Sequence, residues 1–361
     1  MSPHRRQLPA ELSDALELVA PGTDLREAIE NIIRAHNGAL IVVSYPEKLE
    51  RLGIISGGMK IGLEFAPMRL YELAKMDGAI VVSPDVSVLH YANVQLAPDP
   101  DLESQETGLR HRAAQRTAKQ TGDLVIAVSE RRRVVSLYRG PYGPHVLEDI
   151  GVVLSKANSA IATLEKFTSR LREEAQVLTM HEYDGAVTLR EVASAISTFE
   201  YSVRIAEEIE AYVRELGSEG RLVAMQLEQA FHRIPEQYDA LLHDYVEEGV
   251  DYRQVRRELK DFSSEQLTDP LEIIQLLGYG AVSQTEDIYV KPRGYRQLVR
   301  VPRLPRKVAE NLIHEFGSLE GLLDATEEEL DEVEGVGPTR ARAIHRRLER
   351  QRNLEPSSEV P

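Results

Sequence analysis

Two short segments of the sequence contain residue types that could hold a nucleotide. The first is Asp77-Gly78 at a predicted helix-to-strand turn, and the second is Arg110-His111-Arg112 at the predicted start of a helix. Basic side chains at a helix start add their charge to unpaired backbone N–H groups and the positive end of the helix dipole, which favours a polyphosphate. The Asp77 carboxylate could bind Mg²⁺ or Mn²⁺ or orient a hydroxyl, and Gly78 would let a ligand approach the backbone closely. A carboxylate together with a phosphate clamp fits nucleotidyl transfer.

Each segment also has a simpler explanation. Clustered basic residues more often mark a solvated helix start, and Asp-Gly is a common turn. The chain repeats the tripeptide at Asp184-Gly185-Ala186, in a region without a phosphate-binding element, and we interpret that copy as a turn and helix start only. The run Arg131-Arg132-Arg133 is interpreted as a solvated turn, with a triphosphate contact as the alternative.

The elements that must position these residues form an α/β domain. Helical and strand patterns alternate up to about residue 145, and the β runs at 124–128 and 134–138 are close enough for a hairpin, so we expect a mixed central sheet. From Leu154 to Leu178 apolar residues recur at a 3-4 spacing, which predicts one long helix with further helices after it. We expect these helices to pack on each other, with self-association along the long one as the alternative. The predicted domains are an α/β domain (1–147), an all-α middle domain (148–288) and an all-α C-terminal domain (289–361).

Composition limits the class of protein. The 361 residues include no Cys, and 43 basic against 59 acidic residues give a net charge of −16. The lack of Cys excludes disulfides, thiolate nucleophiles and cysteine-based metal sites, and it favours a reducing cytoplasm. The negative charge argues against coating DNA or an anionic membrane through bulk charge. No apolar run approaches the roughly 18 residues that span a bilayer, so we expect a cytoplasmic protein with no membrane partner.

Another group of candidate functional residues lies near the C-terminus. The sequence from Glu334 to Ala341, EGVGPTRA, resembles a helix-hairpin-helix motif, whose glycines permit a tight turn with N–H groups that grip a DNA phosphate regardless of base sequence. Residues 335–352 carry six Arg and one Glu, whereas 324–334 carry seven acidic residues and no basic one. A more degenerate hairpin at 303–307 would make a tandem pair, and the alternative is a helical module that binds protein. The predicted DNA-binding residues are Gly335, Val336, Gly337, Thr339, Arg340 and Arg342.

The stretch from Pro67 through Arg139 resembles the diadenylate cyclase domain over nearly its whole length. The segments that carry the resemblance are RLYELAKMDGA (69–79), YANVQL (91–96), ETGLRHR (106–112) and AKQTG (118–122). With a helical middle and a hairpin module in this order, the chain is similar to bacterial diadenylate cyclases that survey DNA integrity. The resemblance implies that two ATP are converted into cyclic di-AMP and two pyrophosphates, with Mg²⁺ or Mn²⁺ as the cofactor.

The resemblance also implies a role for each matching residue. Asp77 would lie by the 3′-hydroxyl and the metal, and Arg110, His111 and Arg112 would hold phosphates, which makes these four the expected catalytic residues. The residues expected to bind ATP are Gly78, Ala79, Leu96, Thr107, Gly108, Leu109, Ala113 and Ser129. The family usually has Thr at position 113 and sometimes at 109. The lost hydroxyl at Ala113 would weaken phosphate binding by about 0.5–1.5 kcal/mol.

Assembly and regulation are implied by the resemblance alone. It implies an octamer built from two face-to-face tetramers, association with the nucleoid, and cyclase activity that branched DNA suppresses. The alternative from a different functional class is a DNA-binding scaffold whose nucleotide site has degenerated, motivated by Ala113.

Overall fold

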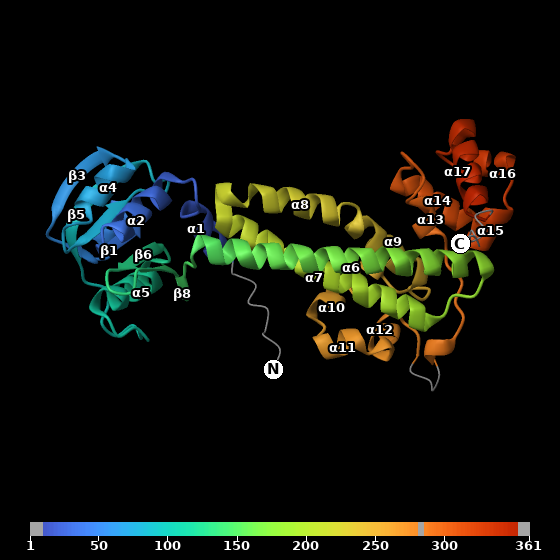
Figure 1. Cartoon of the computed structure of the whole chain (residues 1–361), viewed down its shortest axis with the longest axis horizontal. Coiled ribbons are helices and arrows are strands. Elements are labelled where there is room, and N and C mark those ends of the chain that lie inside the picture. The colour runs from blue at the N-terminus through green and yellow to red at the C-terminus, as the bar shows by residue number, and fades with distance from the viewer. Residues whose placement is uncertain (1–9, 281–284, 353–361) are drawn as a thin grey trace, which may run out of the picture. The chain divides into compact units, whose positions relative to one another are not determined.

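The structure is a computed structural model that describes residues 10–280 and 285–352 (Figure 1). Within these ranges the chain folds into two compact units. Residues up to 159 form the first unit together with 209–225, and residues 160–208 form the second together with those from 226 onward. The α/β domain with a mixed sheet, the long helical middle region and the helical C-terminal module are all confirmed.

The first unit is organised by an eight-stranded mixed sheet. The strand order is β2-β5-β4-β1-β6-β7-β8, and β3 also pairs with β5. β1 and β4 are parallel and every other pairing is antiparallel, which includes the predicted hairpin of β6 and β7. The strands are β1 (Ala39–Val43), β2 (Ile55–Ser56), β3 (Met59–Glu64), β4 (Ala79–Val82), β5 (Val88–Leu96), β6 (Leu124–Ser129), β7 (Val134–Arg139) and β8 (Tyr142–Val146).

Helices cover both faces of the sheet. Because side chains alternate along a strand, Ile41 and Val43 of β1 enter one apolar core while Leu40 and Val42 enter the other. The first core includes α1, α2 and α4, and the second includes α3 and α5. Figure 1 shows α2 and α4 side by side against the strands. The helices are α1 (Ala10–Leu18), α2 (Asp24–Arg34), α3 (Pro46–Arg51), α4 (Pro67–Leu73) and α5 (Leu109–Thr121).

The middle region is helical, as its apolar spacing predicts. The long helix α6 spans 35 residues, and its Leu171 and Leu178 are buried in one core with α7, α9 and α10. No helix in the described ranges is long and apolar enough to cross a membrane. The helices are α6 (Ile150–Asp184), α7 (Leu189–Leu216), α8 (Arg221–Phe231), α9 (Ile234–Tyr245), α10 (Tyr252–Asp261), α11 (Ser264–Thr268) and α12 (Pro270–Leu276), with 3-10 turns at Gly217–Gly220 and Thr285–Asp287.

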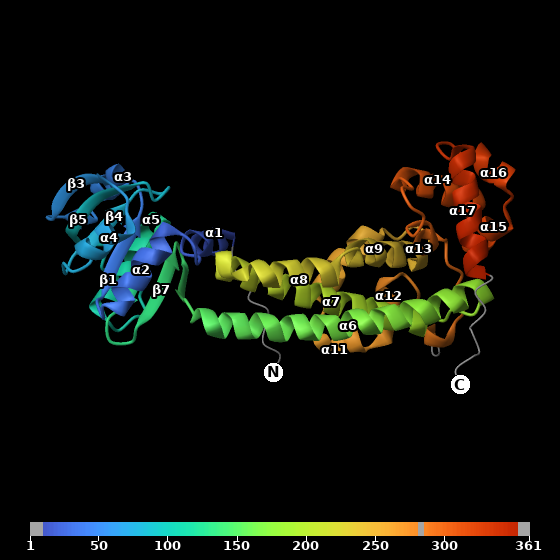
Figure 2. The ribbon, with the colours of Figure 1, turned by 45° about the horizontal axis from the view of Figure 1, so that its top comes forward.

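The C-terminal module is a cluster of short helices around α17 (Figure 2). Its own apolar core contains Leu312, Leu330 and Ile344, all fully buried. The module contains α13 (Tyr295–Leu298), α14 (Arg306–Phe316), α15 (Leu319–Asp324), α16 (Glu327–Glu332) and α17 (Gly337–Arg352).

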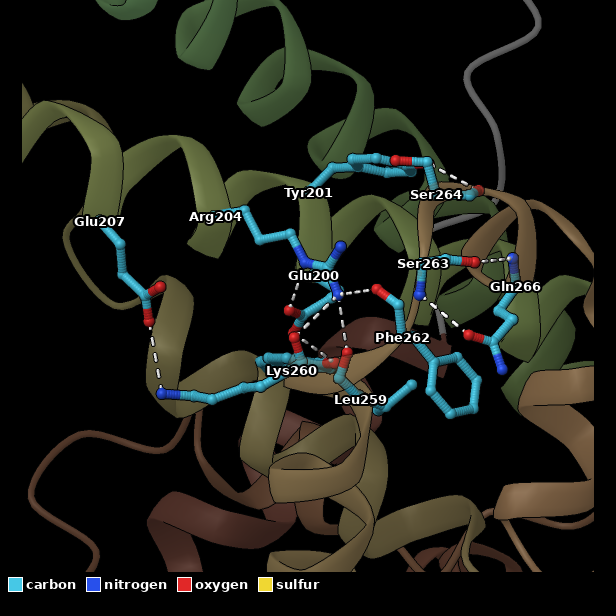
Figure 3. Close-up of polar contacts among 11 residues, drawn as sticks. Glu200, Tyr201, Arg204, Glu207, Leu259, Lys260, Phe262, Ser263, Ser264 and Gln266 are labelled. Carbon is cyan, nitrogen blue, oxygen red and sulfur yellow. Dashed lines mark hydrogen bonds and ion pairs between the residues drawn. The ribbon is translucent and has the colours of Figure 1, made fainter. Parts of the chain in front are cut away.

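A partly buried arginine joins α7 to the end of α10 (Figure 3). The Arg204 guanidinium donates to the backbone oxygens of Leu259 and Phe262, each at 2.8 Å. It also pairs with Glu200 at 2.9 Å, and the Glu200 side chain is only 1% exposed. Because the last carbonyls of a helix have no partner within the helix, this arginine acts as the cap of α10.

We predict that Arg204→Ala lowers the free energy of unfolding of the second unit by about 3 kcal/mol, because it leaves a buried carboxylate without its cation. The measurement is the urea midpoint of the full-length protein, followed by circular dichroism. Arg170→Ala is the matched control, because Arg170 is 60% exposed and pairs with Glu174 on one helix; its cost should stay below about 1 kcal/mol. Equal shifts for the two variants would contradict the capping role.

Candidate nucleotide site and DNA-binding hairpin

A pocket of about 810 Å³ lies where the turn before β4 faces the start of α5. Asp77 reaches it from the turn, and Arg110 and Arg112 reach it from the first turn of α5. Asp77 is exposed, so its carboxylate is accessible to a ligand. The structure thus brings the acidic turn and the cationic helix start to one cavity, although they are more than thirty positions apart in the sequence.

Eight of the twelve residues expected to be catalytic or to bind ATP line this pocket. They are Asp77, Gly78, Ala79, Leu96, Leu109, Arg110, Arg112 and Ala113. The lining does not include the other four expected residues, which are Thr107, Gly108, His111 and Ser129.

The four remaining residues lie around the start of α5 and the β6–β7 turn. Gly108 is the N-cap of α5 and offers no side-chain cap, so N–H groups of the first turn remain available to an anion. The Thr107 backbone oxygen accepts from Arg112 at 3.4 Å, and the Ser129 hydroxyl accepts from the Arg132 N–H at 3.3 Å. His111 is half-buried, and its Nδ1 lies 3.0 Å from the Tyr138 hydroxyl.

Glycine at position 78 is required by its neighbour Asn93. Asn93 has a left-handed backbone with φ 54°, and its Oδ1 accepts a hydrogen bond from the Gly78 N–H at 3.0 Å. A Cβ on Gly78 would overlap the Asn93 backbone and lie 2.6 Å from its Cα. We expected this glycine to admit a ligand, and the structure adds a second reason for it, which is the packing of the turn on β5.

A second glycine makes room for Arg110. A Cβ built on Gly38, just before β1, would overlap the Arg110 guanidinium and lie 3.2 Å from the Val128 oxygen. The arginine therefore lies directly against the backbone of the sheet, which restricts where its cationic group can point. No sequence signal singled out Gly38, because the contact joins residues more than seventy positions apart.

The loop from β5 to α5 is held by polar side chains of α5. Arg116 donates to the Leu102 oxygen at 2.7 Å, and Lys119 donates to the Glu103 oxygen at 2.7 Å. Gln115, which is 6% exposed, accepts from the Ser104 hydroxyl at 2.5 Å. These contacts hold the loop that forms one wall of the pocket against the helix that carries the cations.

Sequence reasoning missed several lining residues. They are Leu40, Asn93, Val94, Gln95, Ala97, Pro98 and Arg116. The motif around 91–96 included three of them, but its alternating pattern indicates a strand and not which face of the strand meets a ligand. Arg116 follows Arg112 by one helical turn on the same face, and this spacing is the signal that could have identified it.

The pocket fits a divalent cation that is bound partly by its substrate. Among the described residues, no group of three or more His, Asp or Glu side chains could hold a metal ion by itself. Mg²⁺ commonly takes one or two carboxylates and completes its shell with phosphate oxygens and water. Asp77 facing two arginines in one cavity meets that requirement, since the nucleotide phosphates would supply the other oxygens.

The predicted DNA-binding hairpin lies between α16 and α17. Gly335 and Gly337 have φ values of 89° and 67°, which only glycine adopts readily, and Val336 between them is 3% exposed and buried in the core of the module. Arg340 donates to the Gly335 oxygen at 2.6 Å and braces the turn. Thr339, Arg340 and Arg342 are exposed, so the hairpin presents N–H groups and cations at the start of α17.

The earlier hairpin between α13 and α14 shares one feature of this turn and lacks another, because Pro305 has φ −66° where the later hairpin has Gly337 at φ 67°. Arg303 has φ 59° at the place that Gly335 occupies in the later hairpin. The helix that follows the earlier hairpin contacts the later one, because the Asn311 side chain of α14 donates to the Glu334 oxygen at 3.0 Å. The module is therefore a pair of hairpins, as the sequence pattern suggested.

We predict that Gly78→Ala weakens ATP binding by at least about tenfold, because the added methyl group forces Asn93 and the acidic turn to move. The measurement is calorimetric titration of the full-length protein with an ATP analogue that lacks the 3′-hydroxyl. Gly280→Ala is the control, since a Cβ there meets nothing within 4 Å. Unchanged affinity in Gly78→Ala would show that the turn tolerates displacement.

Three family models match successive parts of the chain. The DisA bacterial checkpoint controller nucleotide-binding model matches residues 26–141, the DisA linker-region model matches 147–286, and a helix-hairpin-helix motif matches 301–355. A crystal structure of DacA from Staphylococcus aureus is 20% identical over 37% of this chain and 87% of its own, with a TM-score of 0.27.

Curated relatives match nearly the whole chain. A DNA integrity scanning protein DisA from Clostridium tetani is 45% identical over 97% of both chains. Proteins of the same name from Bacillus subtilis and Carboxydothermus hydrogenoformans are each 46% identical over 94% of this chain, and they are covered over 94% and 96% of their own lengths. The chain therefore belongs to the DisA family of diadenylate cyclases that carry a helix-hairpin-helix DNA-binding module.

Proposed function

We propose that the 810 Å³ pocket binds one ATP and that Asp77, Arg110 and Arg112 carry the condensation of two ATP into cyclic di-AMP. The observation that supports this assignment is the meeting of one exposed carboxylate and two guanidinium groups in a single pocket. Apolar side chains from β1 and β5, Leu40, Val94 and Leu96, line the same cavity and offer a surface for a base.

The reaction forms two phosphodiester bonds. Each 3′-oxygen bonds to the α-phosphorus of the opposite ATP, the bond from that phosphorus to the bridging oxygen breaks, and pyrophosphate leaves. Each 3′-hydroxyl loses its proton. Because each hydroxyl attacks the other nucleotide, two sites must face each other, and a single copy of the chain is inactive. Leu109, which is 83% exposed beside the pocket, is placed to be covered by a second copy. We place this pairing within the octamer that the family resemblance implies.

The residues of the chain position reactants and balance charge. Asp77 accepts a hydrogen bond from the 3′-hydroxyl and directs its oxygen, and Arg110 and Arg112 bind the phosphates whose charge grows as pyrophosphate leaves. A divalent cation, Mg²⁺ or Mn²⁺, would be held by Asp77 and would supply further charge neutralisation at the phosphates. Ala113 lines the pocket without offering a donor, so the arginines and the N–H groups at the start of α5 carry that role.

The DNA-binding role belongs to the tandem hairpins. The N-terminus of α17 presents N–H groups beside Arg340 and Arg342, whereas α16 begins with a capping box in which Glu329 and Thr326 satisfy each other. An anion is therefore attracted to α17 and repelled from α16. Two hairpins can grip two phosphates of a duplex, and branched DNA is the form that we propose the module recognises in surveying DNA integrity.

We predict that Asp77→Asn lowers cyclic di-AMP formation by roughly 100-fold or more and leaves ATP binding within a few fold, because the amide cannot bind a cation or orient the hydroxyl as a carboxylate does. Product formation is measured with purified full-length protein, ATP and Mg²⁺ or Mn²⁺. Asp184→Asn is the matched control, since Asp184 opens the second Asp-Gly-Ala tripeptide of the chain and is exposed. A wild-type chain without product would instead support the scaffold alternative.

We predict that Thr339→Glu weakens DNA binding by about tenfold or more at moderate salt, because its carboxylate stands where a phosphate must approach. The substitution should not lower the stability of the fold, because an acidic residue in the first turn of a helix interacts favourably with the helix dipole. Leu222→Glu is the matched control, because it adds the same charge in the first turn of α8 at a side chain that is 64% exposed and lies outside the hairpin module. Affinities for a duplex and a four-way junction are measured by fluorescence anisotropy, and equal losses in both variants would refute the hairpin assignment.

A further inference from the structure

Behind the first turn of α5, one tyrosine hydroxyl joins a glutamate and a histidine. Tyr138 of β7 is fully buried, and its hydroxyl donates to Glu106 Oε1 at 2.8 Å. The same oxygen lies 3.0 Å from Nδ1 of His111, with the two rings edge to face at 66°. Glu106 belongs to the loop before α5, so the three groups connect the sheet, the loop and the helix that carries the phosphate clamp.

The number of hydrogens available to Glu106, Tyr138 and His111 determines which ring nitrogen of the neutral histidine carries its hydrogen. A tyrosine hydroxyl has one hydrogen, and a carboxylate has none to give. With the hydroxyl hydrogen directed at Glu106, the Tyr138 oxygen can only accept from His111, so Nδ1 must carry a proton. If the hydroxyl hydrogen pointed at His111 instead, lone pairs of the Tyr138 oxygen and of Glu106 Oε1 would face each other at 2.8 Å. In the neutral ring Nε2 then has a lone pair and no hydrogen, and among the described residues it has no hydrogen-bond partner.

This tautomer cannot donate to a phosphate. A phosphate oxygen accepts hydrogen bonds, so a neutral His111 held through Nδ1 presents a lone pair to it. Donation from Nε2 requires a second proton on the ring, and the imidazolium that results would add a positive charge beside the nucleotide.

The charged groups around His111 keep the free ring neutral near neutral pH. Burial lowers the pKa of His111 below its ordinary value of 6.5; Glu106 opposes this shift, and Arg110 and Arg132 reinforce it. Burial also raises the pKa of Tyr138 far above its usual range, with Glu106 adding to the shift, so the tyrosine keeps its hydrogen. Two cations near the ring disfavour its protonation until a polyanion neutralises them.

We propose that Glu106 and Tyr138 are positioning residues that hold the Nδ1–H form of His111, so that ATP binding is coupled to uptake of a proton at Nε2. The proposal rests on the assignment of the pocket as the ATP site. It also requires the phosphates to extend past the pocket lining to the Nε2 edge of His111, whose Cδ2 lies beside Gly108 at the start of α5. The proton arrives from solvent, no bond other than N–H forms, and the ring becomes an imidazolium that donates to a phosphate oxygen while Nδ1–H stays on Tyr138. The phosphate clamp is thereby completed only when nucleotide is present.

The test is calorimetric titration of the full-length protein with the Mg²⁺ complex of 3′-deoxy-ATP, which binds but cannot react. At pH 8, titrations in buffers of different ionisation enthalpy should show uptake approaching about one proton per bound nucleotide. Apparent affinity should fall by up to about tenfold per pH unit as pH rises above the lowered pKa of the free ring. Below that pKa the ring is already charged, and uptake should vanish.

Three variants test whether Glu106 and Tyr138 act through the protonation of His111 or only through packing against it. Tyr138→Phe keeps the aromatic ring at position 138 but removes the hydroxyl that accepts from Nδ1 of His111. The neutral imidazole can then carry its hydrogen on Nε2, and proton uptake should fall toward zero. Glu106→Gln should have the same effect, because the amide can donate to the tyrosine oxygen and turn the hydroxyl hydrogen toward Nδ1. His111→Gln should abolish uptake while retaining a donor. Tyr91→Phe is the matched control, since it removes another tyrosine hydroxyl that donates to a glutamate, Glu50, and that has no hydrogen bond to a histidine among the described residues. Wild-type uptake should remain.

The outcomes distinguish the two proposals. Nucleotide binding without proton uptake in the wild-type protein would overturn the coupling and leave the ATP site standing, as would uptake that persists in both Tyr138→Phe and Glu106→Gln. Absence of any binding would overturn the ATP site itself and the coupling with it.

Discussion

The close packing of α5 on the sheet is the constraint on which the proposed nucleotide site depends. Ala114 and Ala118 are fully buried between the helix and the strands, and such small side chains let the helix axis approach the sheet closely. Gly38 extends the same close approach to the first turn, where Arg110 lies against the backbone of the sheet. The direction of the helix therefore sets where its N-terminal N–H groups and cations point, and that direction is toward the turn at Asp77.

The loop before α5 depends on the same packing. Its backbone is bound by side chains that α5 itself provides, Gln115, Arg116 and Lys119, and its end is bound to the sheet through Glu106 and Tyr138. The wall of the pocket and the proposed phosphate-binding residues are therefore both held in place by α5. A substitution that moved α5 would displace the cations and the loop together, so binding and catalysis would be lost as a unit and not in separable parts.

The sequence carried enough information for the fold class and for part of the site. Alternating patterns predicted the mixed sheet, and the residue types at Asp77 and Arg110 predicted groups that the structure brings to one pocket. What it could not predict are contacts between distant positions. Nothing local marks Gly38 as the neighbour of Arg110, or Asn93 as the residue in a left-handed conformation that makes glycine necessary at position 78. The orientation of His111 toward Tyr138 has the same origin, because it is set by a strand 27 residues further along the chain.

The start of the hairpin module is fixed to the helical region of the second unit by buried charge. Asp244, at the end of α9, accepts three backbone N–H groups at the start of α13 at 2.7–2.8 Å, and Arg296 of α13 forms an ion pair with Glu182 of α6 in which both side chains are at most 6% exposed. Burial raises the pKa of Asp244, the nearby Glu182 carboxylate adds to that shift, and the N–H groups of Arg296 and Tyr295 oppose it. Removing one member of such a network leaves a buried charge without compensation, which is far more costly than losing a surface pair. The start of the hairpin module is therefore joined to α6 and α9 by buried polar contacts, so a displacement of α13 would disturb charged groups on both helices.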